Sequence, residues 1–362
     1  MDISSKVRDH FPVFETEIYA NTATCGLMHR DLMKWRRTHD LDFLNNGSTA
    51  KQGVAELLED TRAAVAHLFN GVSQNVALAP SFSQGLNLLL EGLHPKEKIL
   101  LLEEDYPSLN WPFESRGFQR NYVALGPTME TQIYEGIKRH HSTVFACSLV
   151  QWYNGIKIDL DFLKQLCTDF PELMVIADGT QFLGTESLDF EASKIAVLGS
   201  SGYKWMLSGY GNAFFMVAPH FMDRFVLKAS GYGSGRNMKH LSEERTFCKH
   251  LEPGHLDSLS FGSLRYALSF FQEVGLDPIG SHNRTLSEVA KTTFGAMGLL
   301  EDAVIQRAIH STIFNLRLDE ASYTRLLQNG VSCARRGPGV RVAFHLYNTI
   351  NDIATIAKLI EK

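Results

Sequence analysis

The segment MVIADGTQFLG (174–184) is the part of the chain that decides the fold. Its apolar half predicts a buried strand that ends near Asp178, and Gln181 follows three residues later. In open α/β sheets, ligands bind beyond the carboxyl ends of the strands, which is where Asp178 would stand. Taken alone, the segment equally allows Asp178 to be a turn residue or a helix N-cap.

Short apolar runs of the same kind recur through the first two thirds of the chain. We expect seven strands, at 76–79, 99–102, 122–125, 144–149, 174–177, 195–198 and 214–217. Continuous apolar strands are typical of a sheet that is covered on both faces. Helices are expected between them, most clearly at 53–69, where apolar residues fall on one face. This alternation predicts a mainly parallel α/β sheet.

The pattern changes after Gly231. Two helical segments, around 257–274 and 281–300, precede a small α+β unit with strands at 313–316 and 340–344 and helices at 319–328 and 349–359. We therefore place a domain boundary near residue 255. The large domain would comprise residues 16–255, and the small domain residues 1–15 and 256–362.

Composition favours small-molecule chemistry. The formal charge is -5, from 35 basic and 40 acidic residues, and no run of like charges suggests a nucleic-acid or membrane partner. The five cysteines show no C-x-x-C spacing, which indicates reduced thiols and neither a disulfide framework nor a metal site. No signal peptide is visible, and no window approaches the ~18 apolar residues of a transmembrane helix. We expect a cytoplasmic protein.

Two further segments carry candidate functional residues. In GSSGYKWMLSGYGNAFFMV (199–217), Lys204 lies among small residues between two apolar strands. Burial would lower its pKa toward the neutral amine that attacks an aldehyde, although for this motif alone a surface lysine on a Gly-rich turn is favoured. In ALAPSFSQGLNLLLEGL (77–93), the residues from Ser81 to Gln84 begin an apolar helix whose N-terminus suits a phosphate, or is merely capped by serine.

Together these segments resemble the class V aminotransferase family of fold-type I pyridoxal 5′-phosphate (PLP) enzymes. Its branch with cysteine desulfurases, selenocysteine lyases and isopenicillin N epimerase-like proteins is the most similar. The matching motifs occur in order: IYANTATCG (18–26), SFSQGLN (81–87), EEDYPSLNWPF (103–113), DGTQ (178–181), SGYK (201–204), LEPGH (251–255) and RVAFHLYNT (341–349). The resemblance implies the PLP-dependent transferase fold, with a sheet sandwiched by helices in the large domain and a smaller α+β domain at the C-terminus.

The resemblance also implies roles for individual residues. Lys204 would carry PLP as a Schiff base and move protons at the substrate Cα, and Asp178 would pair with the pyridine nitrogen. Arg341 would bind the substrate α-carboxylate through its bidentate fork. In a homodimer, His255 would reach the phosphate of the partner subunit, where the family usually has threonine. The other implied contacts come from phosphate donors (Phe82, Ser83 and Ser201), a ring stacked on the pyridine (Tyr106) and a donor to the 3′-oxygen (Gln181).

Some positions depart from the family pattern or leave alternatives open. Cys333 lies too early to be the nucleophilic loop cysteine of cysteine desulfurases, so we expect a core cysteine and no persulfide chemistry. Either Gln151 or Asn154 would supply a second contact to the 3′-oxygen. Arg335 and Arg336 indicate either an acidic substrate side chain or a solvated turn, and the turn is favoured.

The sequence therefore predicts a PLP-dependent enzyme that acts on a small amino acid, with an aminotransferase as the first hypothesis. A PLP-dependent lyase or epimerase is the alternative within the same chemistry, because these reactions begin with the same carbanion. A non-catalytic binding protein with the PLP fold is the alternative from another class. A nicotinamide dehydrogenase is disfavoured, because the glycine cluster at 231–235 follows the sheet and does not open a first βα unit.

Overall fold

The structure is a computed structural model that describes residues 3–235 and 247–361. Its centre is a seven-stranded sheet with the strand order β2-β8-β7-β6-β5-β3-β4. In this sheet β8 runs antiparallel to β2 and β7, and the other pairs are parallel. The seven predicted strands are confirmed as β2 (Val76–Ala79), β3 (Lys98–Leu102), β4 (Gln119–Val123), β5 (Val144–Ser148), β6 (Met174–Asp178), β7 (Val197–Ser201) and β8 (Ala213–Val217).

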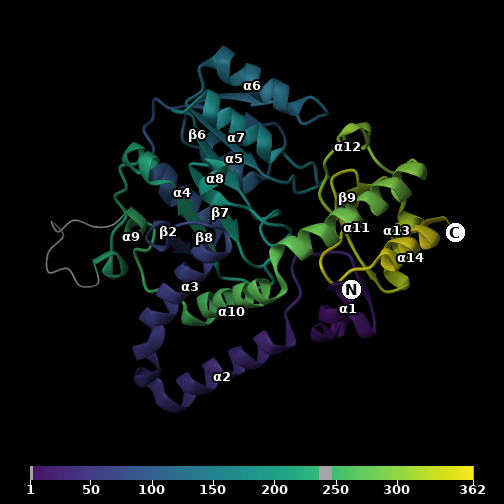
Figure 1. Cartoon of the computed structure of the whole chain (residues 1–362), viewed down its shortest axis with the longest axis horizontal. Helices are drawn as coiled ribbons and strands as arrows, with labels where there is room; N and C mark the ends of the chain where they lie inside the picture. The colour runs from purple at the N-terminus through teal and green to yellow at the C-terminus, as the bar shows by residue number, and fades with distance from the viewer. Residues whose placement is uncertain (1–2, 236–246, 362) are drawn as a thin grey trace.

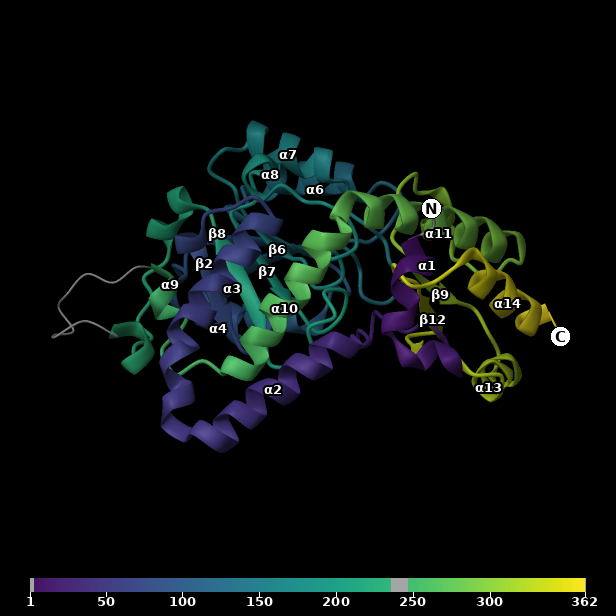
Figure 2. The same ribbon diagram turned by 60° about the horizontal axis from the view of Figure 1, so that its bottom comes forward.

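Helices cover both faces of this sheet, which explains why most strands are apolar throughout. Figure 2 shows α6, α7 and α8 on one side and α3 and α10 on the other. Every residue of β2 and of β5 to β8 is buried, whereas β4 forms a partly exposed edge. The helices of this part are α2 (Arg30–Asn46), α3 (Val54–Leu68), α4 (Phe82–Gly92), α5 (Pro107–Glu114), α6 (Met129–His140), α7 (Leu160–Asp169), α8 (Phe190–Ser193), α9 (Phe247–His250) and α10 (Ser258–Val274).

A smaller α+β unit lies at one end of the molecule (Figure 1). It contains an antiparallel sheet with the order β11-β12-β9, and a short parallel pair, β1 with β10. Its elements are α11 (Leu276–Ala296), α12 (Asp302–Gln306), β9 (Ile313–Leu316), α13 (Glu320–Gln328), β10 (Val331–Ser332), β11 (Ala334–Arg336), β12 (Gly339–Ala343) and α14 (Ile350–Glu361), with β1 (Ile18–Tyr19) and α1 (Ile3–Val7) from the N-terminus. The predicted fold class is confirmed.

The N-terminal residues join this smaller unit, where Arg8 contacts Asp352 at 3.5 Å. The helix after residue 255, α10, packs against α3, and the hydroxyl of Thr61 donates to the carbonyl of Phe261 at 3.3 Å. The domain boundary near residue 255 therefore stays a prediction, because α10 continues the packing of the preceding part.

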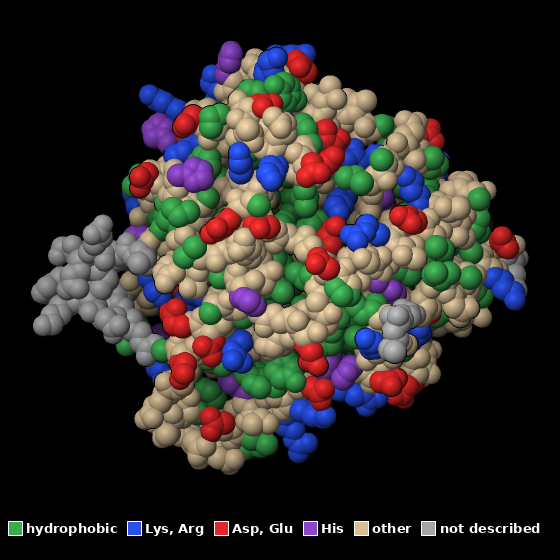
Figure 3. Space-filling model, in the orientation of Figure 1, with side chains coloured by type: hydrophobic (Ala, Val, Ile, Leu, Met, Phe, Trp, Pro, Cys, Tyr) green, Lys and Arg blue, Asp and Glu red, His purple; other side chains and the backbone are tan. Residues whose placement is uncertain are grey.

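On the face shown in Figure 3, Lys and Arg side chains are interspersed with Asp and Glu. Across residues 3–235 and 247–361, no helix has the length and apolar character needed to cross a bilayer. The cysteines at 25, 147, 167, 248 and 333 are all free thiols.

Candidate active site

The carboxyl ends of the parallel strands bring the predicted chemical residues to one edge of the sheet. Asp178 ends β6, and Lys204 follows three residues after Ser201, which ends β7. The two strands pair in parallel with Asp178 opposite Gly199, so their ends lie side by side. The structure thus places Lys204 and Asp178 in one buried site.

Burial dominates the electrostatics of Lys204 and Asp178, which are 6% and 4% exposed. Burial lowers the pKa of Lys204 to about 7, with the charge of Asp178 opposing the shift and two nearby arginines adding to it. Burial raises the pKa of Asp178 to about 6, against the hydrogen bond that Thr180 N–H donates to Oδ1 at 2.8 Å. Each side chain affects the pKa of the other, although no ion pair within 4.0 Å joins them.

Two tyrosine rings flank the amine of Lys204. Its Nζ lies 5.3 Å from the ring centroid of Tyr106 and 5.5 Å from that of Tyr203. The backbone of Tyr106 is fixed by Asp105, whose Oδ1 accepts from Tyr106 N–H at 2.7 Å and whose Oδ2 accepts from Ser148 N–H at 2.8 Å. Tyr106 is therefore held beside the amine, where an aromatic ring can stack on a bound heterocycle.

The N-terminus of α4, predicted to bind a phosphate, lies beside the end of β7. Ser81 caps this helix, with its hydroxyl accepting from Gln84 N–H at 3.2 Å, and Ser83 lies in the first turn. The N–H of Phe82 donates to the hydroxyl of Ser201 at 3.1 Å, so the two predicted phosphate-binding segments contact each other. Free N–H groups and hydroxyls at a helix N-terminus bind phosphate readily.

The ring of Phe215 sets how closely α4 approaches the sheet. A Cβ at Gly85 in α4 would lie 2.0 Å from this ring, and a Cβ at Gly199 in β7 would lie 2.4 Å from it. Phe82 stacks on the same ring with centroids 5.5 Å apart. Because only glycine fits at both positions, the anion site and the strand leading to Lys204 are packed around one side chain.

The amide of Gln181 is fixed by two neighbours. The indole of Trp205 donates to its Oε1 at 2.6 Å, and its Nε2 donates to the carbonyl of Ala23 at 3.1 Å. This assigns the amide orientation and leaves one hydrogen of Nε2 for a ligand.

The structure separates the two alternatives at positions 151 and 154. Asn154 donates to Glu301 and accepts from Ile156 N–H at 3.1 Å, so its amide is occupied. Gln151 is 1% exposed, and its side chain interacts with the carboxylate of Asp105, although neither amide atom makes a hydrogen bond of regular geometry. Gln151 is therefore the less constrained amide of the pair.

Arg341 is a buried cation without a carboxylate partner in the described part of the chain. One Nη donates to the carbonyl of Trp152 at 2.5 Å and the other to the hydroxyl of Thr24 at 2.6 Å, while Nε is buried without a partner. Burial lowers the pKa of Arg341 to about 10. A guanidinium held by neutral oxygens alone is ready to bind an anion.

Sequence reasoning missed several residues of this site. The segment from Thr24 to Gly26 packs directly on the lysine loop, where Gly26 N–H donates to the carbonyl of Tyr203 at 2.9 Å. Nothing in its composition signals this contact, which forms between distant parts of the chain. Asp105 follows β3 as Asp178 ends β6, so the same rule on strand ends would have found it.

His255 lies between α9 and α10, outside the segments that form this cluster. It is exposed and stacks on Tyr232, with ring centroids 4.8 Å apart. The loop before it is anchored by buried Glu252, which accepts from Leu78 N–H at 2.9 Å and pairs with Arg62. The contact of His255 with a partner's phosphate stays a prediction.

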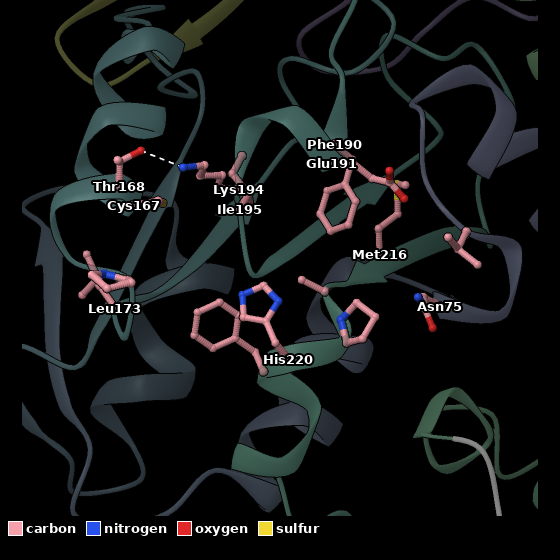
Figure 4. A pocket seen from close by; sticks show the side chains of 15 residues that line it. Asn75, Cys167, Thr168, Leu173, Phe190, Glu191, Lys194, Ile195, Met216 and His220 are labelled. Carbon is pink, nitrogen blue, oxygen red and sulfur yellow. Dashed lines mark hydrogen bonds between the residues drawn. The ribbon is translucent and has the colours of Figure 1, made fainter.

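A second cavity, of about 460 Å³, opens at the opposite edge of the sheet (Figure 4). It lies where β6 and β7 begin and β8 ends, and its lining is mostly apolar, including Leu173, Ile195 and Met216. The amine of Lys194 at its rim is held by the hydroxyl of Thr168 at 2.9 Å. This cavity shares no residue with the cluster around Lys204.

Relatives at low identity are mostly aminotransferases or cysteine desulfurases by name. An uncharacterized aminotransferase of Schizosaccharomyces pombe is 24% identical over 84% of this chain and 81% of its own length. A probable cysteine desulfurase of Pyrococcus abyssi is 21% identical over 100% of this chain and 98% of its own length.

Solved structures share the fold. The apo cysteine desulfurase of Thermococcus onnurineus superposes with a TM-score of 0.87 at 16% identity, covering 100% of this chain and 98% of that one. A mutant of C-DES with glycine covalently linked to its PLP cofactor superposes with a TM-score of 0.83 at 16% identity, covering 98% and 99%. The aminotransferase class-V family matches residues 36–356. The chain therefore belongs to the aminotransferase class-V family.

Proposed function

We propose that this protein is a PLP-dependent enzyme that acts on a small amino acid, as an aminotransferase. The observation that carries the proposal is the buried amine of Lys204, whose pKa is lowered to about 7. An amine in this state is largely neutral slightly above neutral pH, and only the neutral amine attacks an aldehyde.

The residues at the site fit PLP. The N-terminus of α4 with Ser83 and Ser201 suits the phosphate, Tyr106 suits the ring face, and Asp178 suits the pyridine nitrogen. Gln151 has no hydrogen bond of regular geometry and Gln181 has one unused hydrogen, whereas Asn154 is bound to Glu301, so we propose Gln151 and not Asn154 for the contact with the 3′-oxygen. When bound, PLP withdraws electrons from a bond at the substrate Cα.

The protein's own groups then position the substrate and move its proton. Arg341 binds the α-carboxylate, because its guanidinium has no competing anion among the described residues. Lys204 would take the proton from the substrate Cα and, for amino-group transfer, deliver it to the PLP carbon that carried the aldehyde, because an amine with a pKa of about 7 can both accept and release a proton. Asp178 would pair with the protonated pyridine nitrogen of PLP, and the burial of Asp178 and Lys204 would limit the access of water.

A desulfurase reaction is disfavoured by the position of Cys333. This thiol is 7% exposed between β10 and β11, and burial raises its pKa to about 11. Such a cysteine is a poor nucleophile, as expected for a core residue. A lyase or epimerase is the remaining alternative. An aminotransferase would transfer the amino group to a keto acid, whereas an epimerase would remove the chirality of the amino acid and a lyase would remove its side-chain substituent.

The proposal is tested by detecting the covalent bond between Lys204 and PLP. Purified wild-type protein should show the visible absorption of a lysine-bound PLP and lose it on borohydride reduction, with the label recovered on the peptide that contains Lys204. Lys204→Ala should lose the covalent label, whereas Lys194→Ala, at the second cavity, should keep it. A wild-type protein that acquires no reducible label with added PLP would contradict the proposal.

We further propose a homodimer in the cytoplasm. The exposed stacked pair of His255 and Tyr232 is free in one chain to contact a second copy, and the five free cysteines suit a reducing compartment. Light scattering after size-exclusion chromatography should give twice the monomer mass of 40.6 kDa. A fully active monomer would contradict the dimer.

A further inference from the structure

The pairing of β11 with β12 places Arg336 and Arg341 on the same face of the small sheet. Arg336 lies opposite Gly339, and Arg341 lies opposite Ala334. Because side chains alternate along a strand and paired residues share a face, these four positions point to one side. Arg336 and Arg341 are thus diagonal neighbours on this face, and the side chain of Asn315 packs over Gly339 beside them.

Arg335 points the other way, and its charge is already neutralised. It lies opposite Val340, forms an ion pair with Glu320 and stacks over the ring of Tyr323 at 4.7 Å. This arginine is the solvated turn residue that the sequence suggested. Its neighbour Arg336 differs, since it is half-buried and donates to the carbonyl of Arg335 at 2.8 Å, with no carboxylate partner in the described residues.

The charge of Arg336 reaches the active site. After the effect of burial, Arg336 contributes to the lowered pKa of both Lys204 and Arg341. Two guanidinium groups on one face, both without a carboxylate among the residues described, leave positive charge beside Lys204 beyond what a single substrate carboxylate neutralises.

The backbone holds Arg336 in place. The side-chain amide of Asn315 in β9 donates to the carbonyl of Arg336 at 2.7 Å. A Cβ at Gly339 would lie 2.2 Å from Oδ1 of the same asparagine, so the three strands are packed at this point as closely as glycine allows. The position of Arg336 relative to Arg341 is therefore set by the sheet and not by a free loop.

We propose that Arg336 binds the second carboxylate of a dicarboxylic amino acid or of the matching keto acid, while Arg341 binds the first. The inference rests on the proposed function and names its substrate class. A planar guanidinium forms two parallel hydrogen bonds with a carboxylate, which suits Arg336 to this group.

The test is equilibrium binding to the holoenzyme at constant ionic strength. Succinate and glutarate are titrated by calorimetry against butyrate and valerate, which have the same chain lengths and one carboxylate less. The dicarboxylates should bind wild type on the order of tenfold more tightly, because each carries one more charge-assisted hydrogen-bonded group. Arg336→Gln should remove this preference, and Arg335→Gln, the matched control on the opposite face, should keep it.

A wild type without preference, or Arg336→Gln with the preference intact, would overturn the inference. Arg336→Lys keeps the positive charge but cannot form two parallel hydrogen bonds, so it should retain part of the preference. A retained part shows that the loss in Arg336→Gln comes from binding and not from misfolding. Borohydride labelling of Lys204 involves no carboxylate ligand. A labelled enzyme without the preference thus refutes the substrate class alone, whereas an unlabelled enzyme refutes the proposed function.

Discussion

Gly26 lies so close to Lys204 that no side chain fits between them: a Cβ at residue 26 would stand 1.9 Å from the carbonyl oxygen of Lys204. The N–H of Gly26 also donates to the neighbouring carbonyl of Tyr203 at 2.9 Å. The N-terminal segment thus supports the backbone of the lysine loop directly.

Gly26→Ala should therefore displace this loop. We expect a loss of about 1–3 kcal/mol in the free energy of unfolding, as for other overpacked sites, and weaker retention of PLP. Urea denaturation and dialysis of the holoenzyme measure the two effects. Gly53→Ala is the control, because nothing lies within 4 Å of a Cβ there, and it should be neutral or slightly stabilising.

The lowered pKa of Lys204 predicts how the apoprotein captures PLP. The capture rate should rise with pH through a midpoint near 7, because the neutral amine is the reactive form. Asp178→Asn removes the negative charge that favours the ammonium form, so the midpoint should move to lower pH. Stopped-flow absorbance at saturating PLP gives both profiles, and a midpoint near the ordinary value of 10.5 would contradict the burial of the amine.

Glu252→Ala should be strongly destabilising. Its carboxylate pairs with Arg62, which is 5% exposed, and accepts from the N–H of Leu78, so its removal leaves Arg62 without its buried partner and the Leu78 donor unpaired. We expect a loss of about 3–5 kcal/mol, measured by urea denaturation. Glu59→Ala removes the other, largely exposed partner of Arg62 and should change stability by less than about 0.5 kcal/mol; equal losses for the two variants would disprove the distinction.

His345 should make the fold sensitive to acid. Burial lowers the pKa of His345 to about 3, and its Nε2 contacts the carbonyl of Trp205 at 2.9 Å. Between about pH 6.5 and that value the unfolded chain binds a proton that the folded chain does not, so stability falls as pH decreases through this window.

The size of this effect is on the order of 2 kcal/mol between pH 7 and pH 5 for one fully buried histidine. His345→Gln cannot titrate and should lose less stability than wild type over the same interval, even if it is less stable at pH 7. Urea midpoints at the two pH values provide the comparison. An identical loss in wild type and variant would show that His345 does not contribute.

The central strands were predictable because burial on both faces leaves an apolar run in the sequence, whereas the exposed edge strand β4 begins three residues before the predicted run. α2 was not predicted, since among its residues only Leu32 is buried and an exposed helix has little apolar periodicity. The residue patterns singled out Asp178 and Lys204 and the family resemblance added Arg341, and the structure brings all three close enough to affect the pKa of Lys204.

The contacts that the sequence left open depend on geometry between distant segments. Gln151 and Asn154 are both amides near one strand end, and only the bond from Asn154 to Glu301 distinguishes them. Arg335 and Arg336 are adjacent identical residues, and the register of β11 alone sends them to opposite faces. Neither relationship leaves a periodic signal in the chain.

The ring of Phe215 in β8 affects the spacing of two other elements, α4 and β7. Since the cap of α4 and the backbone before Lys204 both rest on it, the span from anion site to amine is governed by the thickness of one phenyl group. A cofactor of fixed length must match that span. A smaller residue at position 215 would thus alter the fit of a cofactor that it does not contact, because the N-terminus of α4 could move toward the sheet.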